Sequence, residues 1–184
     1  MLAQKSAMGL FGPFFIDAGY SLTQLGLLSG AGSLTLGLIG ALSGGALVRA
    51  FGSQPILLGA VLVQSLLLAL VALAAFGIGP HWLAPATIAP IALVISSAVM
   101  ALGFVALYAQ FMAWSDPRQG GVDFTLFQCA DAGVSMIAGL TAGLVAERFG
   151  YGPFFAASAL VALIALPLLL QATGPRQDKA RSHV

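Results

Sequence analysis

A long stretch without charged side chains limits what this chain can fold into more than any other feature. Between Arg49 and Asp116 the sequence contains no Asp, Glu, Lys or Arg. Crossing the hydrocarbon core of a bilayer takes about 20 helical residues, so this stretch is predicted to cross more than once. Charged residues make up only 7% of the chain, against about 25% in soluble domains, too few to cover the surface of a soluble globule. The sequence therefore predicts an integral membrane protein.

The composition also excludes several other classes of protein. A hydrophobic content of 59% with a net charge of +1 excludes a disordered chain. Because there is no basic patch, we expect no nucleic-acid partner. Cys129 is the one cysteine, so the sequence allows neither an intrachain disulfide nor a zinc cluster of four Cys and His ligands. No phosphate-binding loop, metal-ligand spacing or Ser/His/Asp set is present, so we expect no enzymatic activity and no cofactor.

Prolines and charged residues divide the chain into membrane spans. Pro80, Pro85 and Pro90 interrupt the charge-free stretch, and a continuous lipid-exposed helix does not tolerate such a cluster. Charged residues bracket the other apolar segments. The predicted fold is an all-α integral membrane domain over residues 1–176, followed by a polar cytoplasmic tail over 177–184. The six predicted spans cover residues 1–17, 24–47, 55–77, 90–113, 122–145 and 152–172.

The first of these segments is too short to cross a bilayer. Only eleven residues separate Lys5 from Asp17, and Pro13 is one of them. The segment is either a short helix in the membrane interface or, as we favour, the outer half of a helix whose first half is missing from this chain. It lacks the cleavage site of a signal peptide.

The Lys and Arg residues predict the orientation in the membrane. With the amino end in the cytoplasm, the inner side carries six of these residues, and the outer loops carry only Arg148. Cytoplasmic loops of membrane proteins are enriched in Lys and Arg, so both termini are predicted to lie in the cytoplasm. The six inner residues are Lys5, Arg49, Arg118, Arg176, Lys179 and Arg181.

A sequence motif occurs twice, 98 residues apart. Residues 45–55 and 143–153 share a glycine at the first position, a Phe-Gly pair and a final proline. Each copy is typical of a helix end, a glycine stop and a proline in the first turn of the next helix. Independent use of common turn residues is one explanation, and an inverted repeat of three plus three spans, as in many secondary transporters, is the other. The inverted repeat predicts that residues 24–77 and 122–172 superimpose after rotation about an axis in the membrane plane.

Three segments resemble parts of major facilitator transporters. Residues 44–52, Gly-Gly-Ala-Leu-Val-Arg-Ala-Phe-Gly, are similar to the Arg-containing loop between the second and third helices of each half. Residues 13–26 resemble the outer end of helix seven and the start of helix eight. Residues 121–131, Gly-Val-Asp-Phe-Thr-Leu-Phe-Gln-Cys-Ala-Asp, resemble helix eleven of the AmpG-like branch, most of all its RhtX/FptX type of siderophore permease. The resemblance spans the whole chain, as the carboxyl-terminal half of such a protein.

This resemblance implies a function and partners. It implies secondary active transport of a small solute across the inner (cytoplasmic) membrane, with an iron–siderophore complex as solute and protons as coupling ions. It also implies an amino-terminal six-helix half as a partner and a gating loop that contains Gly45, Arg49 and Gly52. Arg49 is equally well explained as a positively charged anchor at the inner membrane surface. The alternatives are a truncated membrane fragment that does not transport, and a permease for a muropeptide, a sugar or a drug.

Asp131 is the leading candidate for the chemistry of transport. It lies about ten residues into its predicted span, roughly 15 Å from the inner end and near the middle of the membrane. A charged group at that depth costs a few kcal/mol, so it usually faces a cavity or a partner and takes part in function. The alternative is a protonated carboxyl that hydrogen-bonds a neighbouring helix. If Asp131 carries a proton and has no charged partner, its replacement by Asn is predicted to abolish accumulation of solute and to make the protein slightly more stable.

Polar and aromatic residues surround Asp131 on its own helix. They share one helical face, a mixture that suits a polar ligand with an aromatic or apolar body. Phenylalanines that face lipid are the simpler explanation of the rings alone. The residues of this face are Phe124, Gln128, Asp131 and Ser135, with Phe127 at its border.

Two further polar residues lie within predicted spans. Tyr108 is either a cavity wall or part of the aromatic belt at the membrane interface. Gln64 is a candidate substrate contact, although an interhelical hydrogen bond explains it more simply. The second span, in addition, carries small residues at spacings of three and four, which predicts close packing of this face against another helix. This small-residue line consists of Gly26, Gly30, Ser33, Gly37, Ala41 and Gly45.

Overall fold

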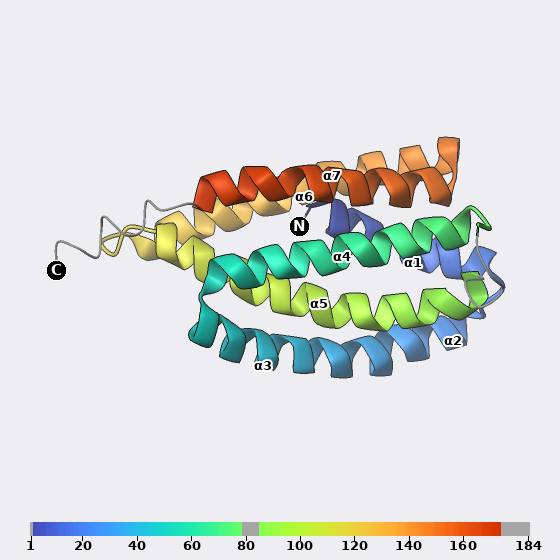
Figure 1. Cartoon of the computed structure of the whole chain (residues 1–184), viewed down its shortest axis with the longest axis horizontal. Helices are drawn as coiled ribbons and strands as arrows, with labels where there is room; N and C mark the ends of the chain where they lie inside the picture. Colours follow the sequence, from blue (N-terminus) through green and yellow to red (C-terminus); the bar gives the residue numbers. More distant parts are fainter. Residues whose placement is uncertain (1, 79–84, 174–184) are drawn as a thin grey trace.

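The computed structural model describes residues 2–78 and 85–173, and every element in these ranges is a helix. The helices lie side by side in one elongated bundle (Figure 1). A π-helical segment, η1, joins α2 to α3 without a break, so the three form one long helix. The elements in chain order are α1 (Leu2–Asp17), α2 (Leu22–Leu27), η1 (Leu28–Gly32), α3 (Ser33–Phe51), α4 (Ser53–Ala75), α5 (Pro85–Trp114), α6 (Gly120–Phe149) and α7 (Tyr151–Thr173).

Five segments of the described ranges are long and apolar enough to cross a membrane. They are Leu22–Phe51, Ser53–Ala75, Pro90–Trp114, Gly120–Phe149 and Tyr151–Gln171. A helix pairs nearly all of its backbone polar groups internally, which the bilayer core requires. α1 has 16 residues and is shorter than these five. The structure thus agrees with an all-α protein that spans the membrane. Of the predicted break, Pro80 lies outside the described residues, as does the tail 177–184, whereas α5 begins at Pro85 and contains Pro90.

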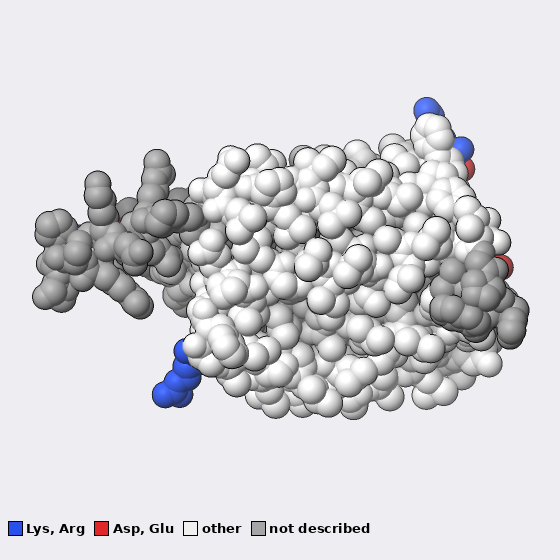
Figure 2. Space-filling model, in the orientation of Figure 1, with Lys and Arg blue, Asp and Glu red and all other residues white. Residues whose placement is uncertain are grey.

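On one face of the bundle, charged side chains lie near the two ends (Figure 2). On the face drawn in Figure 2, Lys, Arg, Asp and Glu atoms appear only near the two ends, and the broad middle shows none. Large hydrophobic side chains are exposed along the helices, among them Leu34, Leu42 and Ile137. An apolar belt between two charged ends matches the hydrocarbon core of a bilayer between its two polar surfaces.

Two hairpin turns, 98 residues apart, have the same backbone geometry. Gly52 ends α3 with φ +90° and ψ 163°, and Gly150 ends α6 with φ +83° and ψ 173°. Each glycine N–H donates to the carbonyl oxygen four residues earlier at 2.9 Å, and the next helix begins at the following residue. This combination of angles is essentially restricted to glycine. The repeated glycines therefore give both turns the same shape.

Two pairs of helices that lie 98 residues apart match in length, and their contacts with α1 and α5 correspond. Leu22–Phe51 and Gly120–Phe149 are both 30 residues long, and α4 and α7 both have 23 residues. α3 packs on α5 as α6 packs on α1, and α4 contacts α5 as α7 contacts α1. The α3–α4 hairpin turns at one end of the bundle, and the α6–α7 hairpin turns at the other (Figure 1). The two hairpins therefore run in opposite directions.

A cluster of aromatic rings forms part of the core between α1 and α7. Phe11 and Phe15 of α1 and Phe155 of α7 are each no more than 1% exposed. The ring centroids of Phe11 and Phe155 are 5.5 Å apart, and Phe14 meets Phe155 edge-on at the same distance. Leu68 of α4 belongs to the same cluster. Between helices in lipid, such packing stabilises the bundle through van der Waals contact rather than through the release of water.

The small residues of α3 that face another helix are not the predicted ones. At the four glycines of the small-residue line, a Cβ would meet no atom of another described element within 4 Å. Gly40 and Gly44 face α5 instead, where a Cβ would lie 2.2 Å from the carbonyl oxygen of Ala98 and 3.0 Å from Cα of Leu102. Within the described residues, therefore, no helix packs on the glycines of the predicted line. The helix carries small residues on more than one side, and spacing alone does not show which side meets a neighbour.

Candidate functional site

Asp131 has a charged partner on another helix. The ammonium of Lys5, in the first turn of α1, forms an ion pair with Oδ2 of Asp131 on α6. Lys5 Nζ also donates a hydrogen bond to Oγ of Ser135, one turn further along α6, at 3.2 Å. The side chains of Lys5 and Asp131 are 19% and 13% exposed. Ser135 in turn donates to the backbone oxygen of Asp131 at 2.6 Å, so the three residues form one hydrogen-bonded group.

The position of Lys5 corrects the sequence analysis. The predicted orientation places Lys5 at the cytoplasmic side, but α1 begins about halfway along the bundle, beside the middle part of α6 (Figure 1). Asp131 is the twelfth residue of α6, roughly 17 Å from the start of that helix at 1.5 Å per residue. The two charges therefore meet away from either end of the helix. Arg176, Lys179 and Arg181 lie outside the described residues, and the orientation stays a prediction.

An aromatic ring lies beside this ion pair. The Nζ of Lys5 is 5.1 Å from the ring centroid of Phe104 on α5. The electron-rich face of an aromatic ring attracts a cation at this distance, and the attraction is stronger where water is excluded. Lys5 is thus held by a carboxylate, a hydroxyl and a ring face from two other helices.

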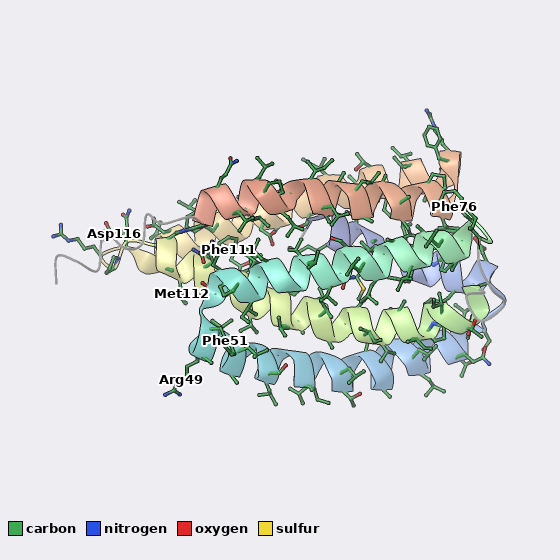
Figure 3. All side chains as sticks on the ribbon, viewed as in Figure 1. Arg49, Phe51, Phe76, Phe111, Met112 and Asp116 are labelled. Carbon is green, nitrogen blue, oxygen red and sulfur yellow. The ribbon has the colours of Figure 1, made fainter. Side chains whose placement is uncertain are left out.

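Further rings continue from Phe104 between α5 and α6. Phe104 stacks on Tyr108 with a centroid distance of 5.8 Å, and Tyr108 meets Phe124 edge-on at 6.1 Å. Phe111 stacks on Phe127 at 5.3 Å, and Figure 3 labels Phe111 near the end of the bundle that also holds Phe51. We call this group the aromatic ladder; it consists of Phe104, Tyr108, Phe111, Trp114, Phe124 and Phe127. It connects the ion pair with one end of the bundle.

The structure brings most of the predicted site together. Asp131 and Ser135 belong to the ion-pair group, while Tyr108, Phe124 and Phe127 belong to the aromatic ladder. Gln128, one turn before Asp131 on α6, is half-buried. The predicted face of α6 is therefore turned toward α1 and α5, against the simpler explanation that its phenylalanines face lipid alone.

Gln64 lies in a different contact. Its Nε2 donates to Oγ of Ser96 at 3.1 Å, and the side chain is buried between α4 and α5. Its Oε1 has no hydrogen-bond partner among the described residues. The bond between two helices supports the packing explanation of Gln64 and separates it from the ion pair.

The three residues of the predicted gating loop serve different purposes. Gly52 shapes the turn between α3 and α4, as described above. Arg49 is exposed in the last turn of α3 and points away from the bundle (Figure 3), where its charge complements the carboxyl end of the helix. Gly45 is exposed on the same helix and lines an open depression together with Arg49. None of the three contacts the ion pair.

Four members of the site were not predicted from the sequence: Lys5, Phe104, Phe111 and Trp114. A usable signal was present for the rings, because residues 104, 108 and 111 recur at helical spacing on one span. For Lys5 the signal was weaker. A carboxylate inside a span usually has a cationic partner, and Lys5 is the one Lys or Arg that lies within a predicted span.

No protein-family model, curated protein or solved structure matches the chain. The resemblance to major facilitator transporters therefore remains a proposal. Chemically, the site offers one acid, one base, a hydroxyl and a row of ring faces. The acid and the base together are neutral, and the carboxylate can accept a proton.

Proposed function

We propose that this chain is the carboxyl-terminal half of a proton-coupled secondary transporter of the major facilitator type in the inner membrane, with both termini in the cytoplasm. It moves a small solute into the cell, and the sequence resemblance proposes an iron–siderophore complex as that solute. The single observation that carries this proposal is the Lys5–Asp131 ion pair within helices that otherwise form an apolar bundle.

An ion pair in this place contributes little to stability. Removing two charges from water costs several kcal/mol per ion, and the attraction between them often does no more than offset that cost. Ionisable residues within membrane spans accordingly mark ion pathways and proton relays in many proteins. When Asp131 accepts a proton, it no longer neutralises Lys5, and the contact between α1 and α6 weakens. Proton binding thereby changes how two helices are held together.

The architecture supports the transporter class. Two pairs of helices have the same lengths at an offset of 98 residues, Leu22–Phe51 with Gly120–Phe149 and α4 with α7, and their turns share one glycine conformation. The main contacts also correspond, because α3 and α4 pack on α5, and α6 and α7 pack on α1. Oppositely directed copies of three spans are a common construction of secondary transporters, with the solute site between them. The inverted three-plus-three repeat is the simplest account of these matches.

Two helices leave a large surface for a second half. Only 6% of the most apolar 18-residue stretch of Leu22–Phe51 is buried, and the same share of Gly120–Phe149 is buried. In Ser53–Ala75 the buried share is 44%. The small-residue line lies on the first of these exposed helices. Small residues allow close approach of a second helix in lipid, so we propose that an amino-terminal six-helix half packs here.

The main alternative is a membrane fragment that does not transport. In that case the ion pair, with Ser135, only holds α1 to α6. A permease for another solute, such as a muropeptide, a sugar or a drug, is the other alternative. Neither is favoured by a specific contact of the site.

Uptake into proteoliposomes tests the proposal. The chain is reconstituted alone and with an amino-terminal six-helix half of a siderophore permease, and accumulation of a ⁵⁵Fe-labelled siderophore is measured with and without an imposed pH gradient. We expect accumulation only with both halves and with the gradient. Asp131→Asn should allow exchange of solute without accumulation, because an amide does not exchange a proton. Asp123→Asn is the matched control, since Asp123 lies in the first turn of α6, away from the ion pair, and accepts a hydrogen bond from the backbone N–H of Asp116.

Equal accumulation by wild type and by Asp131→Asn would exclude the proton role of Asp131. No uptake by either preparation of the wild type, at any gradient, would favour the non-transporting fragment.

A further inference from the structure

We infer that the solute of this site is an organic anion with an aromatic body, which binds to Lys5 while Asp131 takes up one proton. The inference rests on the proposed transport function and narrows the class of solute. It follows from the charge of the group, from the hydrogen-bonding capacity of Lys5 and from the exposure of the aromatic ladder.

Charge balance favours an anion. Lys5 and Asp131 form a neutral pair, and the other charged residues of the described helices lie toward helix ends, such as Asp17, Arg49 and Arg148. A net charge in a low-dielectric region is costly, so the site is expected to stay neutral in each state. A bound cation would raise its charge to +1. A bound anion together with a proton on Asp131 keeps the charge at zero.

The contacts of Lys5 also fit the binding of an anion together with the protonation of Asp131. An ammonium has three N–H donors, and here Lys5 contacts Asp131 Oδ2, Ser135 Oγ and the face of Phe104. After Asp131 is protonated, the ammonium lacks a counter-charge, and a carboxylate of the solute can supply it. The protonated carboxyl of Asp131 then has an O–H that can donate a second hydrogen bond to the same carboxylate. The solute is thus held by two donors, one from α1 and one from α6.

The aromatic ladder explains why the body of the solute is aromatic. Phe104 lies beside Lys5, and the next rings, Tyr108 and Phe124, are half-buried and leave part of their surface open. Offset stacking or edge contact with such rings is favourable for a flat aromatic group. By contrast, the rings of Phe11 and Phe155 in the other aromatic cluster are fully buried and have no free face.

A cationic solute would compete with the chain itself. The ring face of Phe104 and the carboxylate of Asp131 already hold the ammonium of Lys5. To bind there, a second cation would have to displace Lys5, which would then lie in the apolar bundle without a partner. Binding of a cation is therefore the outcome that contradicts the inference.

Three probes that share one ring system separate the charge classes. The purified full chain in detergent is titrated with 2-naphthoate, 2-naphthamide and 2-naphthylmethylammonium by calorimetry, in two buffers of different ionisation enthalpy. We expect naphthoate to bind at least about tenfold tighter than the amide, the factor that one charge-assisted hydrogen bond provides. Its binding should take up about one proton and become tighter as the pH falls, because the bound state holds more protons.

Variants assign the two roles. Lys5→Gln should reduce the affinity for naphthoate to that for the amide. Asp131→Asn should bind naphthoate without uptake of a proton. Each single variant leaves one charge without a partner and is open to misfolding, so the double variant K5Q/D131N, which leaves neither, is measured as well. It should lose both the preference for the anion and the proton uptake, whereas Asp123→Asn should keep both.

The results also distinguish this inference from the proposed function. Tighter binding of the ammonium probe, naphthoate binding without proton uptake by the wild type, or an unchanged preference in K5Q/D131N would overturn the inference. If proteoliposomes accumulate a solute with protons but the three probes bind equally, the transport function stands and the anion site is wrong. If naphthoate binds with a proton but no solute accumulates with either preparation, the anion site stands and the transport function is wrong.

Discussion

Adding one methyl group at Gly40 tests the packing of α3 against α5. A Cβ at Gly40 would lie 2.2 Å from the carbonyl oxygen of Ala98 and 2.8 Å from its Cα, which are backbone atoms and not the end of a flexible side chain. The two helices must therefore move apart. Overpacking of this kind costs about 1–3 kcal/mol, and a backbone contact this short places Gly40→Ala at the upper end of the range.

Two other glycines of the same helix provide matched controls. At Gly44 a Cβ would lie 3.0 Å from Cα of Leu102, so Gly44→Ala should cost less than Gly40→Ala. At Gly37 no atom of another described element lies within 4 Å, and Gly37→Ala should be neutral or stabilise the helix by about 0.5–1 kcal/mol through its higher helix propensity. The same substitution thus has three different expected effects.

The free energy of unfolding of the purified chain can be measured by SDS titration in mild detergent, with intrinsic tryptophan fluorescence as the signal. The expected order of destabilisation is Gly40→Ala, then Gly44→Ala, then Gly37→Ala. If Gly37→Ala destabilises the chain as much as Gly40→Ala, the small-residue line packs within the bundle after all, and the reasoning above is refuted. Wild-type stability of Gly40→Ala would refute it equally.

Three other predictions use the same unfolding measurement. Gly52→Ala and Gly150→Ala should each cost about 1–3 kcal/mol, since both turns need an angle combination that alanine does not tolerate, while Gly45→Ala should not destabilise; unequal effects would contradict the shared turn geometry. Lys5→Met and Asp131→Asn should each destabilise the chain by about 1–3 kcal/mol, less than the cost of breaking a fully buried pair, because both side chains are partly exposed. The double variant should recover part of this loss, and additive losses would mean that the two charges do not interact. Gln64→Leu should change stability by less than about 1 kcal/mol, because the lost bond to Ser96 is offset by removal of an unpartnered buried oxygen, and it should leave uptake unchanged; a loss of uptake would assign Gln64 to the solute path.

The expected effect of Asp131→Asn on stability is the reverse of the one drawn from sequence. Without a visible partner, loss of the carboxylate was expected to stabilise the protein slightly. The structure pairs Asp131 with Lys5, so the single variant leaves an ammonium without a counter-charge. Their distance of 126 residues along the chain explains why no local pattern predicted the pair.

The features that could be predicted from the sequence depend on neighbouring residues. Turn positions at Gly52 and Gly150 follow from glycine and proline within one hairpin, and the shared face of Phe124, Asp131 and Ser135 follows from helical periodicity. The features that could not be predicted depend on which helices meet. α3 carries small residues on several sides, and only the placement of α5 decides that Gly40, and not Gly37, makes the contact.

The contact of α3 with α5 and the contact of α6 with α1 are built differently, and under the proposed transport function this difference predicts which helices move. α3 meets α5 through glycines so closely that no side chain fits between the two backbones. The related contact of α6 with α1 is held by Lys5, Asp131 and Ser135, whose bonding depends on whether a proton and a counter-ion are present. A contact between backbones has one arrangement, whereas an ion pair has a paired and an unpaired state that a ligand can bias. The proposed transport function therefore predicts movement where α1 meets α6, with α3 and α5 moving together as one unit.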